Sequence, residues 1–497
     1  MRLILQSILF VYISFSCLSC YKEEVLYTPI FDKTLEISPL LRLNNAPCGF
    51  DSQLSLLRVS IKNDTIYNYT PYISFQNYSQ IYFNDTLLLQ NNAYNNLGTI
   101  TTSDSYNITI ITNSTTKKLI LTFTTLPIAI ISTPNEIVDE PKTVAYISIY
   151  YPTTNKNFTS NIAIEYRGAT SLHYPKKSYG FALTRSINTL DRYSAEIHGM
   201  RKNTDWILDA MYVDKSRLRN MVSFKLWNQI DSLKRGIQSQ LVELFLNYSH
   251  QGIYCFNEKL NPESLSLTNK DALLYKGISW LNGETTFKTN NPYPANYYSW
   301  DGWKQIYPDI KYSIKWEALY ALKEVAVNYS DDDFKTHISS HINLKSVIDY
   351  YIFLNLLSAW DNAGKNTFLL RTHHAEPFSI LPWDLDGSWG YYWDGTHIRH
   401  TDIINTNLLF NKLIRLNPEN YTIKLKNRWL ELRNTIITYD TIYALFEKEF
   451  QAILSSNCME IENIKWELDI DINKERDFTY NWIQKRLLFL DNYFLNL

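Results

Sequence analysis

The chain has 497 residues, enough for two to three domains. Hydrophobic residues make up 45% of it and the formal net charge is −2, so sizeable cores are possible and a basic nucleic-acid-binding surface is excluded. Beyond the first twenty residues the only cysteines are Cys48, Cys255 and Cys458. An odd, sparse set of this kind excludes a disulfide scaffold and has no metal-ligand spacing.

Residues 1–20 have the pattern of a lipoprotein signal peptide. Arg2 is the short basic region, residues 3–15 are an apolar core too short to span a bilayer, and Cys20 follows Leu-Ser directly. We therefore predict that Cys20 is lipidated and anchors the mature protein to a membrane. The Tyr-Lys-Glu-Glu run at 21–24 resembles the surface-export tag of Bacteroidota lipoproteins, and it fits an ordinary solvated tether almost as well. The expected location is extracytoplasmic, at the outer membrane of a Bacteroidota-like bacterium and exposed at its surface if the tag is genuine.

Residues 25–130 are expected to form an all-β domain. Short stretches of alternating apolar and polar residues are separated by turns rich in Asn, Thr and Ser. The predicted strands cover residues 54–61, 72–75, 81–89, 107–111 and 118–123. Short strands at this spacing are typical of an immunoglobulin-like β-sandwich.

A second domain is expected over residues 131–497, and it opens with a strand and a polar turn. Alternation over 161–166 predicts a half-buried strand. The turn R-G-A-T-S at 167–171 can offer backbone N–H groups to an anion. Lys176 and Lys177 begin the next strand, so that one lysine faces each side, and a solvated strand edge explains this pair equally well.

Three further regions of the second domain are less specific. Arg217 and Arg219 fall on a predicted helix, either as part of a surface face or in contact with phosphates or an internal carboxylate. The Tyr-rich segment 291–307 is interpreted as a loop or lid. Apolar residues at helical spacing predict helices over 442–455 and 478–496.

The most informative stretch, residues 360–390, contains W-D-N-A-G-K-N and W-D-L-D-G-S-W-G. Asp361 and Asn366 have the spacing D-x-x-x-x-N, and Asp384 follows beyond two predicted strands. Kinases use one carboxylate to accept a hydroxyl proton, and an amide and a second carboxylate to hold magnesium on phosphates. Cap and turn roles fit the spacing alone. The acids, however, lie beside tryptophans at the ends of apolar segments, where an unpaired carboxylate is costly.

Eukaryotic kinase landmarks are missing: the chain has no G-x-G-x-x-G loop, V-A-I-K, H-R-D or D-F-G, so a kinase here is a divergent one. Other blocks nevertheless occur in the order of one known family. They read E-Y-R-G-A-T-S (165–171), P-K-K-S-Y (175–179), D-W-I-L-D-A-M-Y-V-D-K-S-R-L-R-N (205–220), Y-S-H-Q-G-I-Y-C-F-N-E-K (248–259), V-I-D-Y-Y-I-F-L-N (347–355) and K-N-R-W-L-E-L-R (426–433). Over roughly residues 130–440 the chain resembles the spore-coat protein H (CotH) kinase family of bacterial atypical protein kinases.

The resemblance implies a role for each matching residue. It places Asp361 as the catalytic aspartate; Asn366 and Asp384 as metal ligands; Arg167, Gly168, Ser171 and Lys177 near the nucleotide phosphates; and Glu258 near the hinge that receives adenine. Asp386, two residues after Asp384, is a further candidate metal ligand. Leu172 departs from the bulkier or basic residue that is common in the family, which bears on nucleotide affinity and leaves the aspartates intact. The implied cofactors are ATP and Mg²⁺ or Mn²⁺.

The expected fold is therefore α+β, with an immunoglobulin-like sandwich followed by a two-lobed atypical protein-kinase-like domain. The leading hypothesis is an extracytoplasmic kinase that transfers the γ-phosphate of ATP to Ser or Thr of a surface or secreted protein. The alternative is a catalytically inactive, surface-binding or adhesion lipoprotein with a kinase-like fold. A hydrolase that uses Asp384 and Asp386 is disfavoured, because these two lie too close for an inverting pair with water between them.

Overall fold

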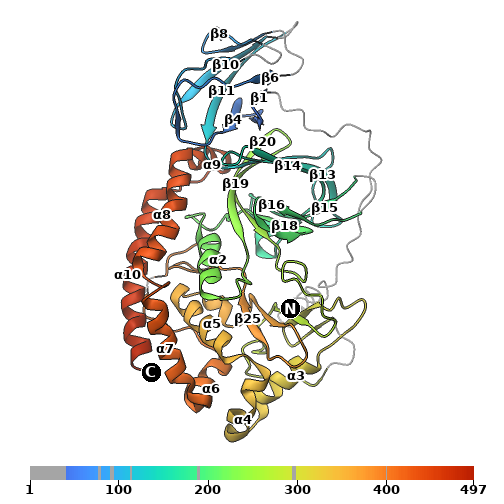
Figure 1. Cartoon of the computed structure of the whole chain (residues 1–497), viewed down its shortest axis with the longest axis vertical. Coiled ribbons are helices and arrows are strands. Elements are labelled where there is room, and N and C mark those ends of the chain that lie inside the picture. The colour runs from blue at the N-terminus through green and yellow to red at the C-terminus, as the bar shows by residue number, and fades with distance from the viewer. Residues whose placement is uncertain are drawn as a thin grey trace, which may run out of the picture.

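The computed structural model describes residues 41–497 except 76–79, 90–93, 112–114, 187–190, 294–297 and 399. Cys20 and the predicted leader lie outside the described residues. The fold is α+β, and three regions follow one another along the long axis in Figure 1: an all-β region, a closed barrel, and a helical region. Helices α8 (Tyr439–Ser456) and α10 (Ile472–Leu495) run along one side of the molecule. No helix among the described residues is both long and apolar enough to span a membrane.

The all-β region covers residues 41–124 and contains a six-stranded sheet in the order β3-β4-β11-β10-β7-β8, a three-stranded sheet β2-β1-β6 and the pair β5-β9. The strands are β1 (Leu41–Leu43), β2 (Ala46–Pro47), β3 (Gly49–Asp51), β4 (Leu56–Ser60), β5 (Thr65–Ile66), β6 (Ile73–Phe75), β7 (Gln80–Phe83), β8 (Thr86–Leu87), β9 (Ile100–Thr101), β10 (Ser105–Ile111) and β11 (Thr116–Thr124).

The prediction of a single strand over 81–89 is wrong. Asn84 and Asp85 both have positive φ and turn the chain into the β7–β8 hairpin. Assignment to the immunoglobulin-like class stays a prediction.

The closed barrel has the strand order β12-β13-β14-β15-β18-β20-β19 and closes through parallel pairing of β12 with β19. Its strands are β12 (Ile128–Ser132), β13 (Thr143–Tyr151), β14 (Lys156–Arg167), β15 (Ser178–Thr184), β18 (Asp205–Asp209), β19 (Ser239–Leu246) and β20 (Ser249–Glu258), and the hairpin β16 (Ala195–Ile197)–β17 (Met200–Asn203) is a separate pair. Ile162 and Ile164 on β14 are fully buried in the barrel core, as the alternation at 161–166 predicts.

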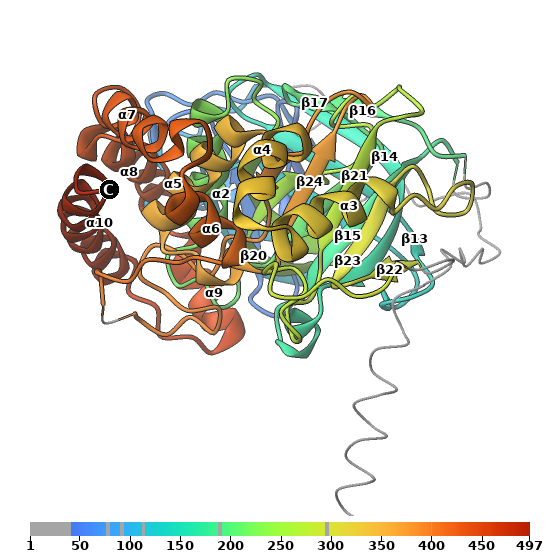
Figure 2. The same ribbon diagram turned by 90° about the horizontal axis from the view of Figure 1, so that it is seen from below.

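The helical region contains a five-stranded sheet in the order β22-β23-β21-β24-β25. Its elements are α2 (Arg219–Ile230), β21 (Leu273–Gly277), β22 (Ser299–Trp300), β23 (Trp303–Tyr307), α3 (Glu317–Lys323), η2 (Glu324–Asn328), α4 (Asp331–His341), α5 (Leu344–Leu357), η3 (Trp360–Ala363), β24 (Thr367–Arg371), β25 (Ser379–Pro382), α6 (Leu408–Leu416), η4 (Pro418–Asn420), α7 (Tyr421–Arg433) and α9 (Cys458–Trp466). From below, helices α7, α8 and α10 lie to one side and the strands of the sheet and barrel to the other (Figure 2).

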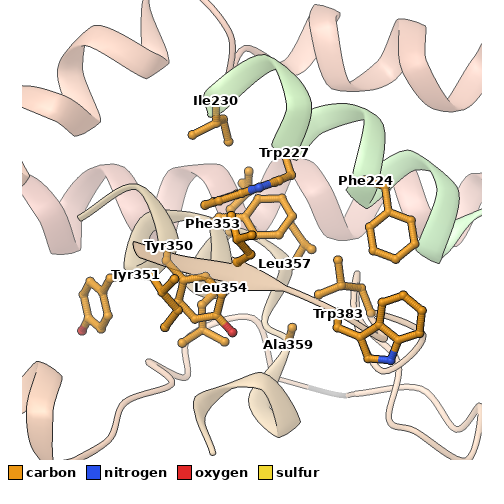
Figure 3. Close-up of a cluster of buried hydrophobic side chains, with 14 of the residues drawn as sticks. Phe224, Trp227, Ile230, Tyr350, Tyr351, Phe353, Leu354, Leu357, Ala359 and Trp383 are labelled. Atoms are coloured by element: carbon orange, nitrogen blue, oxygen red, sulfur yellow. The ribbon is translucent and has the colours of Figure 1, made fainter. Parts of the chain in front are cut away.

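Helix α5 is the centre of this region, and nearly every residue along it is buried. Figure 3 shows Trp227 of α2 lying over the α5 side chains, and its ring centroid is 5.0 Å from that of Phe353. The helix begins where the Asn343 side chain accepts a hydrogen bond from the Ser346 N–H, a standard N-cap. It ends at Ser358, which has a left-handed backbone with φ 52°. The packing of α5 fixes the start of the turn that carries Asp361.

One expectation for this region is wrong, and one pair of open alternatives is decided. The segment 291–307 was expected as a loop or lid, but its end forms β22 and β23, because the buried Trp300 and Trp303 hold it onto the sheet. Arg217 and Arg219 do not lie on a surface helix face. Both are buried, and helix α2 begins only at Arg219.

A buried ion pair connects the three regions. Arg58 of β4 donates from Nη2 to the Glu243 Oε1 of β19 at 3.0 Å, and it also donates to the carbonyl of Ser456 at the end of α8. Both side chains of the pair are fully buried. The backbone N–H of His250 donates to Asp51 at 2.8 Å nearby. The buried Arg58–Glu243 pair therefore attaches the all-β region to the barrel and to the C-terminal helices.

Candidate active site

The D-x-x-x-x-N stretch folds into a closed turn that follows α5 directly. The buried Asp361 carboxylate accepts a hydrogen bond from the Asn366 amide at 3.3 Å and forms an ion pair with the Lys365 ammonium at 3.0 Å. Backbone N–H groups of Gly364 and Lys365 donate to the Asp361 carbonyl. The spacing of five residues thus brings a carboxylate and an amide side by side.

A side-chain amide joins this turn to the loop that carries Asp384. Asn362 donates to the Asn366 carbonyl at 2.9 Å and to the Trp383 carbonyl at 2.7 Å. The Trp383 N–H in turn donates to the Asn366 carbonyl at 3.0 Å. Asn366 and Asp384 both have positive φ, 54° and 52°, which asparagine and aspartate tolerate better than other residues with a side chain. Asp361, Asn366 and Asp384, predicted separately from the sequence, are brought together by these bonds.

The other side of the Asp384 loop is held by helix α2. The Leu385 N–H donates to the Asn220 side-chain oxygen at 2.6 Å, and Arg219 donates to the Asp386 carbonyl at 2.6 Å. Asn220 also donates to the carboxylate of Asp209, at the end of β18, at 3.0 Å. The barrel, α2 and the loop therefore meet at Asn220.

The sequence interpretation missed Asp209 as a member of this site. Its block, D-W-I-L-D, supported the family resemblance but received no role, and an acid that ends an apolar strand was the available signal. Burial raises the pKa of Asp209, and the Asp384 charge raises it further, against the opposing charge of Arg167. Asp209 and Asp384 are consequently close enough to interact electrostatically.

Carboxyl groups crowd around Asp384. The residue retains exposed surface, but protein closely surrounds its carboxyl group, and this loss of water is the main cause that raises the pKa of Asp384. Lys276 and Arg167 oppose that shift, while the charge of Asp361 adds to it. Burial also raises the pKa of Asp386 well above its usual range, with a further contribution from Asp384. An added cation would relieve this repulsion.

Two basic side chains lie over the Trp383 ring next to these acids. The Arg167 guanidinium, at the end of β14, lies 5.7 Å from the ring centroid, and the Lys276 ammonium, on β21, lies 5.1 Å from it. Within the described parts of the chain neither of them donates a hydrogen bond to another residue. Lys276 was missed by the sequence interpretation, although a lysine that directly follows the apolar run 272–275 was a usable signal.

The R-G-x-x-S turn is shaped by its glycine. Gly168 has φ 119°, and a Cβ there would lie 1.7 Å from the Ser171 Oγ, so the turn requires glycine. Ser171 donates to the Arg167 carbonyl at 3.3 Å and so closes the turn beneath the guanidinium-bearing residue. The Lys177 ammonium donates to the Leu172 carbonyl at 2.6 Å, within the same turn. This bond gives the Lys177 ammonium a protein acceptor.

The neighbouring lysine has a different position, although both lysines precede β15, which begins at Ser178 and not at the lysines as expected. Lys176 is fully buried and donates to the Ile253 carbonyl at 2.6 Å and to Glu462 of α9 at 2.8 Å. Glu462 also pairs with Arg217 at 2.8 Å, which is the internal carboxylate that the sequence left open for this arginine. Burial lowers the pKa of Lys176 to about 8, against the opposing charge of Glu462. No motif pointed to Glu462.

Glu258 is not grouped with the other predicted residues. Its carboxylate is fully buried and paired with Arg201, whose Nε donates to it at 3.0 Å, and it also accepts from backbone N–H groups of Arg201 and Gln238. The carboxylate is thus used in joining β20 to the β17 hairpin. A contact with adenine stays a prediction.

The side chains at the site suit a hard divalent cation. The Asn366 amide nitrogen faces Asp361, which leaves its oxygen as a ligand, and Asp384 supplies carboxylate oxygens. Magnesium commonly takes one or two carboxylates and completes its coordination with water and phosphate oxygens. Among the described residues, no three His, Cys, Asp or Glu side chains are placed to hold a metal by themselves.

Comparisons with known proteins agree with the resemblance seen in the sequence. The family model described as CotH kinase protein matches residues 164–490. The inner spore coat protein H of Bacillus subtilis (strain 168) is 22% identical over 246 residues, which is 46% of this chain and 59% of that protein. Among solved structures, the Helicobacter pylori proinflammatory kinase CtkA is matched over 73% of this chain and 99% of its own, with 8% identity and a TM-score of 0.29, a likeness too low to carry an argument.

Proposed function

The chain belongs to the CotH kinase family, and on that premise we propose that it transfers the γ-phosphate of ATP to a Ser or Thr hydroxyl of a protein. The observation that carries this proposal is the convergence of Asp361, Asn366 and Asp384, whose segments are joined through Asn362. We further propose that the barrel and the helical region act as the two lobes of a kinase-like domain, with the phosphates held between Arg167 and Asp384.

Each residue has a distinct task in this proposal. Asp361 accepts the proton of the attacking hydroxyl, and its hydrogen bond from Asn366 fixes the direction in which its carboxylate points. Lys365 neutralises that carboxylate at rest, and its side chain is exposed enough to turn towards a phosphate. Asn366 and Asp384 would hold a divalent cation, which when bound supplies charge neutralisation on the phosphates.

Location and substrate follow from the sequence expectations. We propose that Cys20 is lipidated, so that the catalytic region works outside the cytoplasm on a surface or secreted protein. The all-β region, fixed to the barrel by Arg58 and Glu243, would then lie between the anchor and the catalytic region in sequence.

The test is phosphotransfer by residues 21–497, incubated with labelled ATP and either Mg²⁺ or Mn²⁺. Incorporation of label into the protein itself, or into an added surface-protein fraction, is expected. Asp361→Asn should lower the rate by roughly a hundredfold to ten-thousandfold, because the amide keeps the shape but accepts no proton. Nucleotide binding should persist in that variant. If the unaltered protein and Asp361→Asn incorporate the same amount of label, the kinase assignment is rejected in favour of an inactive, surface-binding role.

A further inference from the structure

We propose that Lys276 is the phosphate-binding lysine of this site, in place of both lysines of the P-K-K-S-Y block. The inference rests on the proposed function, since it assigns a residue to the phosphates of the nucleotide. It departs from the sequence interpretation, which gave that task to Lys177.

The register of the central sheet puts Lys276 beside the catalytic turn. On β21, Lys276 pairs with Phe368 of β24, and the carbonyl of the next residue, Gly277, accepts a hydrogen bond from the Asn366 N–H at 3.1 Å. The Lys276 ammonium lies over the Trp383 ring and interacts electrostatically with Asp384. It is therefore adjacent to Asn366 and Asp384, two of the three residues expected to hold the metal.

The two lysines of the P-K-K-S-Y block are already used. Lys176 is fully buried between the Ile253 carbonyl and Glu462, and withdrawing it would leave a buried carboxylate with one cation fewer. Lys177 donates to the Leu172 carbonyl in the turn before it. Each of these ammonium groups has a protein acceptor.

Lys276 lacks such an acceptor. Within the described residues its ammonium donates no hydrogen bond, although the side chain is half-buried. A lysine carries three donors, and because no protein acceptor takes those of Lys276, phosphate oxygens can accept from them in place of water. Arg167, which also lies over the Trp383 ring, likewise donates no side-chain hydrogen bond to the described residues. Two cations with unused donors, next to a group of acids that suits a metal, form a site for a metal-bound polyphosphate.

The assignment predicts which part of the ligand Lys276 recognises. Because it lies beside Asp384, it should contact the phosphates that share the cation and contribute nothing to base or ribose binding. Its removal should weaken ATP and ADP binding and spare adenosine.

The variant test compares Lys276→Met with Lys177→Met, a matched change in charge and length. Binding of ATP, ADP and adenosine in Mg²⁺ is measured by calorimetry on the full chain, after thermal unfolding has shown that the variants fold. Lys276→Met should weaken ATP and ADP binding by about tenfold to a hundredfold, the loss expected for one charge-assisted hydrogen bond. Lys177→Met should leave binding unchanged. ATP binding retained in Lys276→Met, or lost only in Lys177→Met, would overturn the assignment.

A second measurement needs no variant. The unaltered protein is treated with an amine-reactive ester with and without Mg²⁺-ATP, and labelling of each lysine is quantified by mass spectrometry. ATP should protect Lys276 and leave the labelling of Lys177 unchanged. Undiminished labelling of Lys276 while ATP is bound would overturn the assignment and leave the proposed function standing. Failure of the unaltered protein to bind ATP at all would overturn both.

Discussion

Asn362 donates a hydrogen bond from its side-chain amide to the Trp383 carbonyl at 2.7 Å, across 21 residues of sequence. The same amide donates to Asn366 at 2.9 Å. Since Asp361 precedes Asn362 and Asp384 follows Trp383, this one side chain sets the distance between the expected base and the expected metal ligand.

Asn362→Ala should therefore lower the rate of phosphotransfer as well as the free energy of unfolding. The buried Trp383 carbonyl loses a donor and the Asn366 carbonyl keeps only the Trp383 N–H, at a cost of about 1–3 kcal/mol of unfolding free energy, while misplacement of the reacting groups costs about a hundredfold in kcat. The control is Asn343→Ala, which removes the α5 cap, costs about 1 kcal/mol and lies away from the site. Denaturant unfolding and phosphotransfer rates are measured on both. Equal loss of activity in the two variants would mean that Asn362 has only a structural role.

Asp384→Asn should weaken nucleotide binding only when a divalent cation is present. The substitution removes a negative charge that offsets the cation, and it keeps the size of the side chain. ATP affinity is measured with Mg²⁺ and with EDTA, and we expect the difference between the two conditions to shrink by about tenfold or more. An unchanged response to Mg²⁺ would exclude Asp384 as a ligand.

Gly168→Ala should destabilise the protein more than Gly98→Ala. Both glycines have positive φ, 119° and 74°, so both variants are strained, but only at Gly168 would the new Cβ meet an atom, the Ser171 Oγ at 1.7 Å. The strain alone costs about 1 kcal/mol, and the clash adds about 1–3 kcal/mol. Thermal unfolding compares the two variants. Equal shifts in Tm would show that the Ser171 side chain moves away from the new Cβ at no cost in stability.

The Arg58–Glu243 pair should make stability depend on acid pH. Burial raises the pKa of Glu243, but the charges and hydrogen bonds of Arg58 and His250 outweigh it and bring the pKa to about 2 from 4.5. Because the pKa in the folded protein is the lower one, the stabilisation is complete above about pH 4.5 and is lost as the pH falls towards 2. Unfolding free energies of the unaltered protein and Glu243→Gln should therefore converge over that interval, from a difference on the order of 3 kcal/mol at pH 6. A difference independent of pH would contradict this prediction.

Cys20→Ala should release the protein from the membrane. The prediction depends on the short apolar core before Cys20 and on the thiol as the site of lipid attachment. Cell fractionation and immunoblotting compare this variant with Cys48→Ala, which removes a buried thiol of the all-β region and should stay with the membrane. Retention of both variants would show that lipidation at Cys20 is not the anchor.

The sequence alone was sufficient for the family and for the grouping of Asp361, Asn366 and Asp384, whose roles stay predictions. Asp361 and Asn366 are five residues apart in one turn, and Asp384 follows two short strands, so local spacing encodes most of their relationship. The helices predicted over 442–455 and 478–496 also occur, as α8 and α10, which both begin earlier than predicted, because helical periodicity is a local property.

Tertiary structure decided which other charged residues lie near Asp361, Asn366 and Asp384. Lys276, Asp209 and Glu462 are far from the motif in sequence, and only strand register and helix packing bring them to the site or behind it. The same packing decided between two adjacent lysines whose sequence contexts are nearly identical, and it buried Lys176 while turning Lys177 towards Leu172. Side chains on one strand alternate between faces, but what each face meets depends on elements elsewhere in the chain. This is why local sequence identified Asp361, Asn366, Asp384 and Arg167 and left Asp209 and Lys276 to the fold.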